Sequence, residues 1–176
     1  MKIVKRVALG LAAVVLVLLA VSLFLPSAWT VERSVRINAP AAAIFPYVNS
    51  LKQWPAWTVW YEREPNLRVA YEGPEAGVGA ISRWAGKDGE GEMTITASAP
   101  DEAVRYDLVF NEGEFRAQGE IRLTANGEAT TVHWITRGDA GGNPIGKYFA
   151  LFMDALMGRD FEQGLAKLKN LLEKIE

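Results

Sequence analysis

The hydrophobic positions of this 176-residue chain follow three patterns along its length. Residues 7–25 form an unbroken apolar run, residues 30–137 mostly alternate apolar with polar side chains, and an apolar stripe spaced by three or four residues follows Asn143. The run predicts a membrane helix, the alternation predicts strands with one exposed face, and the stripe predicts an amphipathic helix. We therefore expect an anchor at residues 1–29 and one α+β domain at residues 30–176.

The apolar run at residues 7–25 contains no charge and follows Lys2, Lys5 and Arg6. As a helix rising about 1.5 Å per residue it would extend about 28 Å, close to the roughly 30 Å of a bilayer's hydrocarbon core. Early positive charges favour a cytoplasmic N-terminus. We expect a single-pass bacterial inner-membrane protein with a periplasmic domain. A cleaved signal peptide, which normally has a shorter apolar core, is the alternative, and it too would export the domain.

The domain's elements are predicted as one strand, two short helical segments, six further strands and one long helix. The first strand occupies residues 30–37, and the short helical segments occupy residues 41–48 and 50–54. The further strands are expected at residues 67–71, 78–84, 92–97, 103–110, 115–124 and 130–137. Their short, glycine-containing connections, Lys87-Asp88-Gly89 among them, predict an antiparallel meander, because parallel strands need longer crossovers.

The long helix is predicted to begin with Asn143 as N-cap and Pro144 in the first helical position. Its apolar stripe comprises Ile145, Tyr148, Phe149, Phe152, Leu156, Phe161, Leu165, Leu168, Leu172 and Ile175. The strands are apolar on one face only, with Val104, Tyr106, Leu108 and Phe110 opposed to Arg105 and Asp107. Because both surfaces need an apolar partner, we expect the sheet to curve around the helix.

Short motifs recur in a definite order along residues 31–176. They are Asn38-Ala39-Pro40 with Ile44-Phe45, Trp54-Pro55-x-Trp57, Gly77-x-Gly79, Trp84-x-Gly86, Gly89-x-Gly91-x-Met93-x-Ile95, Thr131-x-x-Trp134, and Met153-Asp154 through Gly158-x-Asp160-Phe161-Glu162 to Gly164-Leu165-x-x-Leu168-Lys169. Their order and spacing resemble the START-like superfamily, also called SRPBCC or helix-grip proteins, and in particular its polyketide cyclase/dehydrase-type branch. The simplest soluble members lack the membrane anchor expected here.

This resemblance implies a helix-grip fold with a hydrophobic cavity between the sheet and the long helix. Members of the superfamily hold lipids, sterols, plant hormones or polyketide intermediates in that cavity. A minority catalyse cyclisation or dehydration. The resemblance therefore implies a small hydrophobic ligand more strongly than it implies a reaction.

Composition removes several classes of chemistry. All 21 acidic residues but only 16 of the 19 basic ones lie after residue 30, so the domain lacks the basic surface that nucleic-acid phosphates require. The chain has no cysteine and a single histidine, His133, which leaves too few ligands for a zinc site. We expect no metal, no cofactor and no nucleic-acid partner.

Candidate catalytic groups are also sparse. His133 shares its strand face with Thr131, Ile135 and Arg137, the expected outer face, whereas a general base must reach a substrate inside the cavity. The acidic residues near turns are expected to solvate loops, and they are Asp88, Glu90, Glu92, Asp101 and Glu102. The segment Gly77-Val78-Gly79 precedes a strand rather than the helix N-terminus that binds phosphate. We therefore name no catalytic residue.

Aromatic residues are concentrated between the short helices and the second strand, where Trp54, Trp57, Trp60 and Tyr61 fall within eight positions. They either fill the core or border a cavity mouth, and the pattern leaves both possibilities open. The candidate cavity residues are Trp57, Trp60, Met93, Tyr106, Phe110, Trp134, Phe149 and Met153, with Trp57 and Trp60 placed nearer the mouth.

Three functions remain open. The leading hypothesis is a membrane-anchored protein that binds a lipid or another small hydrophobic ligand. The second is a cyclase or dehydratase, which would need an inward-facing Asp or Tyr with a shifted pKa. The third is an envelope interaction module with a filled core, which a cavity below the roughly 300 Å³ of a ligand site would indicate.

Overall fold

The computed structural model describes residues 2–87, 89–113 and 115–173, and these contain one sheet and four α-helices. The elements are α1 (Lys2–Ser22), β1 (Ala28–Ile37), α2 (Ala41–Asn49), the 3-10 helix η1 (Leu51–Ala56), α3 (Trp60–Arg63), β2 (Arg68–Glu72), β3 (Ile81–Gly86), β4 (Gly89–Ala99), β5 (Ala103–Phe110), the 3-10 turn η2 (Asn111–Gly113), β6 (Phe115–Asn126), β7 (Ala129–Asp139) and α4 (Pro144–Glu173). Asp88, in a predicted turn, and Ile175, the last residue of the predicted stripe, lie outside the described residues.

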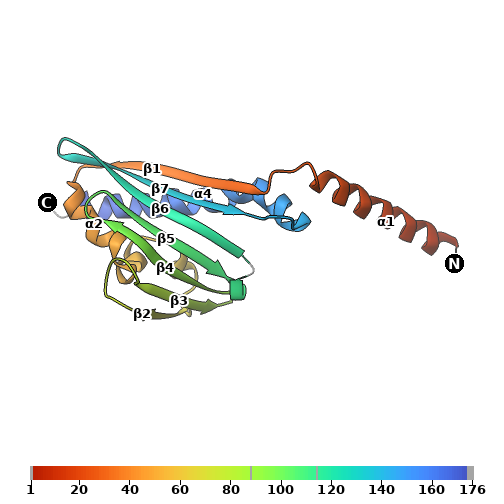
Figure 1. Cartoon of the computed structure of the whole chain (residues 1–176), viewed down its shortest axis with the longest axis horizontal. Coiled ribbons are helices and arrows are strands. Elements are labelled where there is room, and N and C mark those ends of the chain that lie inside the picture. Colours follow the sequence, from red (N-terminus) through yellow and green to blue (C-terminus); the bar gives the residue numbers. More distant parts are fainter. Residues whose placement is uncertain (1, 88, 114, 174–176) are drawn as a thin grey trace.

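The seven strands form one antiparallel sheet in the order β1-β7-β6-β5-β4-β3-β2 (Figure 1). Strands β2 to β7 are a meander, as the short connections predict, and β1 closes the other edge by pairing with β7. Several strand boundaries differ from the prediction, most clearly in β4, which is longer at both ends than residues 92–97, and in β3, which begins at Ile81 rather than at residue 78. Gly77 and Gly79 have φ angles of 79° and 88°, so they form a turn where extended pairing cannot continue.

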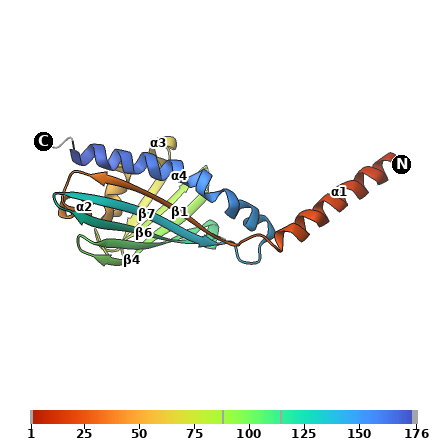
Figure 2. The same cartoon turned by 90° about the horizontal axis from the view of Figure 1, so that it is seen from above.

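Helix α4 runs along one face of the sheet and continues past its end towards α1 (Figure 2). Its predicted cap is confirmed, because the backbone N–H groups of Ile145 and Gly146 donate to Asn143 Oδ1 at 3.0 and 3.1 Å. The buried apolar side chains on α4 are Phe161, Leu165 and Leu168. The expectation that the whole stripe packs on the sheet is wrong, because its members Ile145, Phe149, Phe152 and Leu156 are more than half exposed.

Arg33 on β1 fixes the middle of α4 to the sheet edge. Its Nη1 and Nη2 donate to the two carboxylate oxygens of Asp154 at 2.7 and 3.1 Å, and its Nε donates to Glu162 at 2.6 Å. Gly158 lies between these two acids, and a Cβ there would collide with the guanidinium. The pKa of Arg33 is raised by its hydrogen bonds to Asp154 and Glu162, so the pairing favours its charged form.

Helix α1 is the one element that projects away from the sheet (Figure 1). It begins five residues before the start of the predicted span of residues 7–25 and ends three residues before its end. Among the described helices, α1 alone is long and apolar enough to cross a membrane, a property that signal sequences share. Only residues 23–27 connect it to β1.

A candidate ligand-binding chamber

A cluster of aromatic rings fills the centre of the space between the sheet and α4. Trp134 on β7 stacks on Phe161 of α4 at 4.0 Å with an interplanar angle of 2°. Around Trp134 stand Trp54, Trp57 and Trp60, with ring centroids at 5.8, 5.0 and 5.7 Å. Trp57 and Trp134 have no exposed surface. These two residues are therefore part of a packed core. For Trp57, the sequence had left open whether it fills the core or borders a cavity mouth.

The polar atoms of this cluster are paired. Trp134 Nε1 donates to the Tyr106 hydroxyl at 2.7 Å, and that hydroxyl lies 3.3 Å from Thr136 Oγ1. Burial raises the pKa of Tyr106 to about 12, so its phenol stays protonated at neutral pH. The Tyr106 ring fits because Gly119 on β6 has no side chain, and a Cβ there would overlap the phenol. Tyr106 is thus a structural hydrogen-bonding group within the core.

Beside this cluster lies a chamber of about 430 Å³, within the range of small-molecule sites. It is enclosed by η1, α3, the inner face of β3 to β5, and the middle of α4. Its apolar lining residues are Leu51, Trp54, Trp60, Leu67, Trp84, Met93, Leu108, Phe110 and Met157. The helix α3, which the sequence pattern did not indicate, supplies one wall.

The floor of the chamber depends on a glycine. Trp84 on β3 and Phe110 on β5 meet edge to face with ring centroids 5.5 Å apart. Gly91 on β4 lies between them, directly paired with Trp84 on one side and with Phe110 on the other. A Cβ at Gly91 would collide with the Trp84 indole. The glycine therefore lets the Trp84 indole lie across β4 and contact Phe110.

An ion pair closes the side of the chamber between α3 and α4. Arg63 donates from Nη1 and Nη2 to the two oxygens of the Asp160 carboxylate at 2.7 and 2.6 Å. Trp60 Nε1 also donates to Asp160, at 3.2 Å. The Asp160 side chain is 13% exposed and that of Arg63 is 53% exposed, so the pair stands at the rim. The hydrogen bond to Asp160 raises the pKa of Arg63.

Two hydroxyl-bearing residues line the chamber further in, Tyr61 and Ser82. Burial, with a smaller contribution from Tyr71, raises the pKa of the Tyr61 phenol above its usual value, so Tyr61 keeps its proton. Ser82 is 4% exposed, and its Oγ has no partner at hydrogen-bond distance among the described residues, although a weaker interaction with the nearby Tyr61 phenol offsets part of the rise in the pKa of that phenol. An unpaired buried hydroxyl costs about 1–3 kcal/mol, so a ligand oxygen or nitrogen beside Ser82 would be stabilised.

A second depression, about 720 Å³ and open to solvent, adjoins the chamber and shares Glu64 and Gly89 with it. Its other lining residues are Asn66, Arg68, Ala85, Gly86, Lys87, Glu90 and Asn111. Because it is polar and open, this depression offers an apolar ligand little burial. We treat it as the solvent-facing approach to the enclosed chamber.

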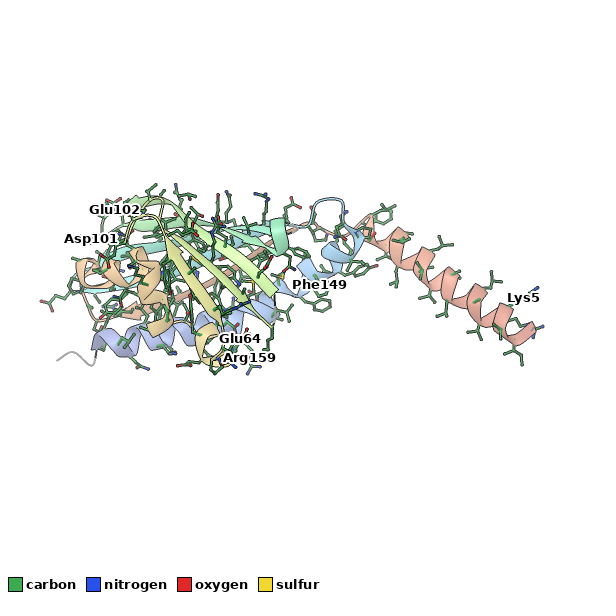
Figure 3. All side chains as sticks on the ribbon, turned by 90° about the horizontal axis from the view of Figure 1, so that it is seen from below. Lys5, Glu64, Asp101, Glu102, Phe149 and Arg159 are labelled. Carbon is green, nitrogen blue, oxygen red and sulfur yellow. The ribbon has the colours of Figure 1, made fainter. Side chains whose placement is uncertain are left out.

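The structure brings only some of the sequence candidates to the chamber. Trp60, Met93 and Phe110 line it. Trp57, Tyr106 and Trp134 lie in the aromatic cluster, and Met153 packs against the core outside the chamber. Phe149 is 58% exposed and lies on the part of α4 nearest α1 (Figure 3).

Sequence reasoning missed the polar lining formed by Arg63, Glu64, Ser82 and Asp160, and it considered Tyr61 only as one of the clustered aromatic residues. Strand alternation contained a usable indication for Ser82, which shares its strand face with Trp84. Asp160 and Arg63 meet only because α3 packs beside α4, nearly a hundred residues later in the chain. No short sequence motif encodes that contact.

The other polar candidates lie away from the chamber. His133 is half-buried on β7, with Nδ1 3.7 Å from the Glu32 carboxylate of β1. Asp101 and Glu102 lie at the β4–β5 turn, at the opposite end of the domain from α1 (Figure 3). Within the described ranges, no three His, Asp or Glu side chains are grouped so that they could hold a metal ion.

Residues 28–173 match the protein family described as polyketide cyclase/dehydrase and lipid transport. Similar solved structures include protein MLL2253 from Mesorhizobium loti, at 14% identity and a TM-score of 0.62, covering 84% of this chain and 98% of that one. The Aha1 dimer from Colwellia psychrerythraea is 17% identical with a TM-score of 0.57, covering 82% of this chain and 96% of that one.

The di-domain ARO/CYC StfQ from the steffimycin biosynthetic pathway is 12% identical with a TM-score of 0.61, covering 84% of this chain and 51% of that one. At these identities, the likeness of all three structures shows the fold alone. A comparison with curated proteins finds no significant match.

Proposed function

Because the chain belongs to the polyketide cyclase/dehydrase and lipid transport family, we propose that it is a membrane-anchored protein that binds a lipid or another small apolar molecule. The observation that carries this function is the chamber of about 430 Å³ beside a fully packed aromatic core. A filled-core interaction module would have no need of such a space, since the volume exceeds the roughly 300 Å³ at which ligand sites begin.

The lining points to a neutral ligand with an apolar body and at least one oxygen or nitrogen. The charges at the chamber are already engaged, since Arg63 pairs with Asp160 and Glu64 accepts a hydrogen bond from the Lys87 backbone N–H at 2.6 Å. A charged ligand would have to break these bonds. A hydroxyl, carbonyl or amide beside Ser82 would instead give its unpaired Oγ a partner.

We assign α1 as the anchor. Its uncharged part, residues 7–22, corresponds to about 24 Å of helix, and the long side chains of Lys5 and Arg6 before it can reach the headgroups while their backbone completes the crossing. The early charges of Lys2, Lys5 and Arg6 favour a cytoplasmic N-terminus, so the domain would lie in the periplasm. A phosphatase fused to the C-terminus should then be active. The mass of the mature protein distinguishes a retained helix from a cleaved signal peptide, and an inactive but stable fusion would refute the orientation.

A cyclase or dehydratase is the second candidate, favoured by the carboxylate of Asp160 and the phenol of Tyr61 at the chamber wall. Both groups are poorly prepared for proton abstraction. Asp160 is held by two hydrogen bonds from Arg63 and one from Trp60, and burial keeps Tyr61 protonated. An enzyme would lose conversion but retain ligand binding in the Asp160→Asn variant, whereas a binding protein would show no conversion at all.

The experiment that tests binding fills the chamber. Met157→Trp replaces a flexible thioether at the chamber wall with a bulkier indole ring, while Val78→Trp adds the same ring at a loop residue that is 58% exposed. The full chain in nanodiscs is titrated with a long-chain alcohol that carries pyrene at its far end. Energy transfer from the chamber tryptophans to pyrene should saturate in the natural chain and in Val78→Trp, and be lost in Met157→Trp.

Mass spectrometry of molecules extracted from the purified natural chain should find a bound species that Met157→Trp lacks. An absence of saturable transfer in the natural chain would refute ligand binding. Equal transfer in Met157→Trp would refute the assignment of the chamber.

A further inference from the structure

The first half of α4 carries an apolar stripe that nothing in the described part of the chain covers. Ile145, Phe149, Phe152 and Leu156 are 68%, 58%, 59% and 57% exposed. Their spacing of four, three and four residues places them on one side of the helix. Apolar stripes of this size on a protein surface usually mark an interaction with another apolar surface.

This stripe begins beside the end of α1. The Tyr148 hydroxyl donates to the Leu18 carbonyl at 2.7 Å, and Lys147 Nζ donates to the Ser22 carbonyl at 3.2 Å. Ser22 is the last residue of α1, and Leu18 lies about one turn before it. Where α1 leaves a bilayer, Tyr148 would therefore lie at the level of the lipid headgroups, a position that tyrosine favours.

The composition of this region fits a membrane surface. Residues 140–156 contain one basic residue, Lys147, and one acidic residue, Asp154, whose charge is paired with Arg33. In the connection after α1, Leu23 and Phe24 are 75% and 88% exposed at the same end of the domain. A helix with aromatic and aliphatic residues on one side and an early lysine is typical of segments that lie in the interfacial plane of a bilayer.

We propose that the first half of α4 lies on the bilayer that α1 enters, with Phe149 and Phe152 inserted at the boundary between headgroups and acyl chains. This arrangement rests on the proposed anchoring by α1. The partner is the lipid surface itself, because α1 and the start of α4 are bonded to each other at the point where the span ends.

The same stripe leads to the chamber. After Leu156, the next position on that side of α4 is Asp160, one turn further on, and Asp160 and Met157 both line the chamber. Figure 3 shows this progression, with Phe149 near α1 and Glu64 and Arg159 together further along the domain. A molecule dissolved in the bilayer would thus follow α4 to the rim of the chamber, where the Arg63–Asp160 pair must move aside to admit it.

The chain lacks cysteine, so single-cysteine variants of the full chain give unique labelling sites. Phe149→Cys and Phe152→Cys are labelled with a nitrobenzoxadiazole dye in vesicles of phosphatidylethanolamine and phosphatidylglycerol. Gln163→Cys is the matched control, an exposed position further along the same side of α4. A nitroxide attached to lipid should quench the dye at positions 149 and 152, whereas aqueous iodide should quench it at position 163.

Val15→Cys in α1 separates the possible failures. Lipid quenching at position 15 without quenching at 149 and 152 would overturn the surface assignment while the anchor stands. Absence of lipid quenching at position 15 would overturn the anchor. Protection of positions 149 and 152 from both quenchers would mean that a protein covers the stripe, which also overturns the assignment.

The route is tested by rates. The double variant Phe149→Ser/Phe152→Ser stays on the vesicle through α1 but loses two inserted rings. If half of its apolar area is buried, each ring contributes about fivefold to the affinity of the first half of α4 for the bilayer. Transfer of the pyrene alcohol from vesicle to chamber should slow at least fivefold, with the equilibrium affinity unchanged, while Gln163→Ser changes neither. Unchanged transfer, or a parallel loss of affinity, would overturn the route.

Discussion

Ser82 has an unpaired hydroxyl, and removing that hydroxyl should have opposite effects on the empty and the occupied protein. Its Oγ is buried on β3 against the chamber without a partner in the part of the chain that the structure describes. The Ser82→Ala variant replaces this hydroxyl with hydrogen at almost no cost in packing. We expect the empty protein to become more stable and the binding of an oxygen-bearing ligand to become weaker.

The size of the effect follows from the location of Ser82. Burying an unpaired hydroxyl costs about 1–3 kcal/mol, and the lower end applies because the chamber opens at its rim. A gain of about 1 kcal/mol corresponds to a Tm increase of roughly 2–4 °C for a chain of this length. Loss of one hydrogen bond to the ligand should weaken the affinity for the pyrene alcohol by about threefold to tenfold.

Ser98→Ala is the matched control. Ser98 Oγ donates to Asn49 Oδ1 at 2.8 Å, so this substitution removes a hydrogen bond that is made. Ser98→Ala should lower the free energy of unfolding by about 1 kcal/mol and therefore lower the Tm. Its affinity for the pyrene alcohol should not change. Both variants are measured as full chains in nanodiscs by near-ultraviolet circular dichroism, which reports the tryptophans around the chamber. If Ser82→Ala lowers the Tm as Ser98→Ala does, the Ser82 hydroxyl has a partner and our reasoning about the ligand fails.

Other substitutions test the core and the helix attachment. Tyr106→Phe leaves Trp134 Nε1 without its acceptor and should cost about 1–3 kcal/mol of unfolding free energy in urea titrations. Gly119→Ala should destabilise the fold by several kcal/mol, because the Tyr106 ring has little room to move; a stable variant would contradict that packing. The hydrogen bond from Arg33 lowers the pKa of Asp154, so this pair stabilises the fold above the unfolded carboxyl pKa of about 3.9 and is lost as pH falls through the folded value. Arg33→Gln should therefore lose less stability than the natural chain between about pH 5 and 2.

The fold could be predicted well because local rules and packing agree. Alternation located every strand, and Asn143-Pro144 located the start of α4, since a cap depends only on neighbouring residues. The amphipathic stripe was less informative about packing. Periodicity shows that one side of a helix is apolar but not whether a sheet lies beneath it, so Phe149 and Phe161 looked equivalent although only Phe161 is buried.

The chamber was harder to predict because it depends on how large side chains divide one enclosed space. Trp57 and Trp134 fill the centre, whereas Trp60 and Trp84 line the chamber, yet all four are inward-facing residues of the same type. Contacts between distant segments, such as the stacking of Phe161 on Trp134, decide which tryptophan fills the core and which lines the chamber. Sequence spacing contains no record of those contacts.

The pairing of β1 with β7 has a consequence for the order in which the domain can assemble. During synthesis β1 emerges first, while its only strand partner is the last to be made, as in the pairing of Val35 with Val132. In the nascent chain, β1 therefore has no strand to pair with until β7 has been synthesised, close to the end of the chain. Contacts so distant in sequence slow folding, and a waiting strand edge is open to association with other chains. Chaperone protection of this first strand would therefore matter more to the yield of native protein than protection of any later one.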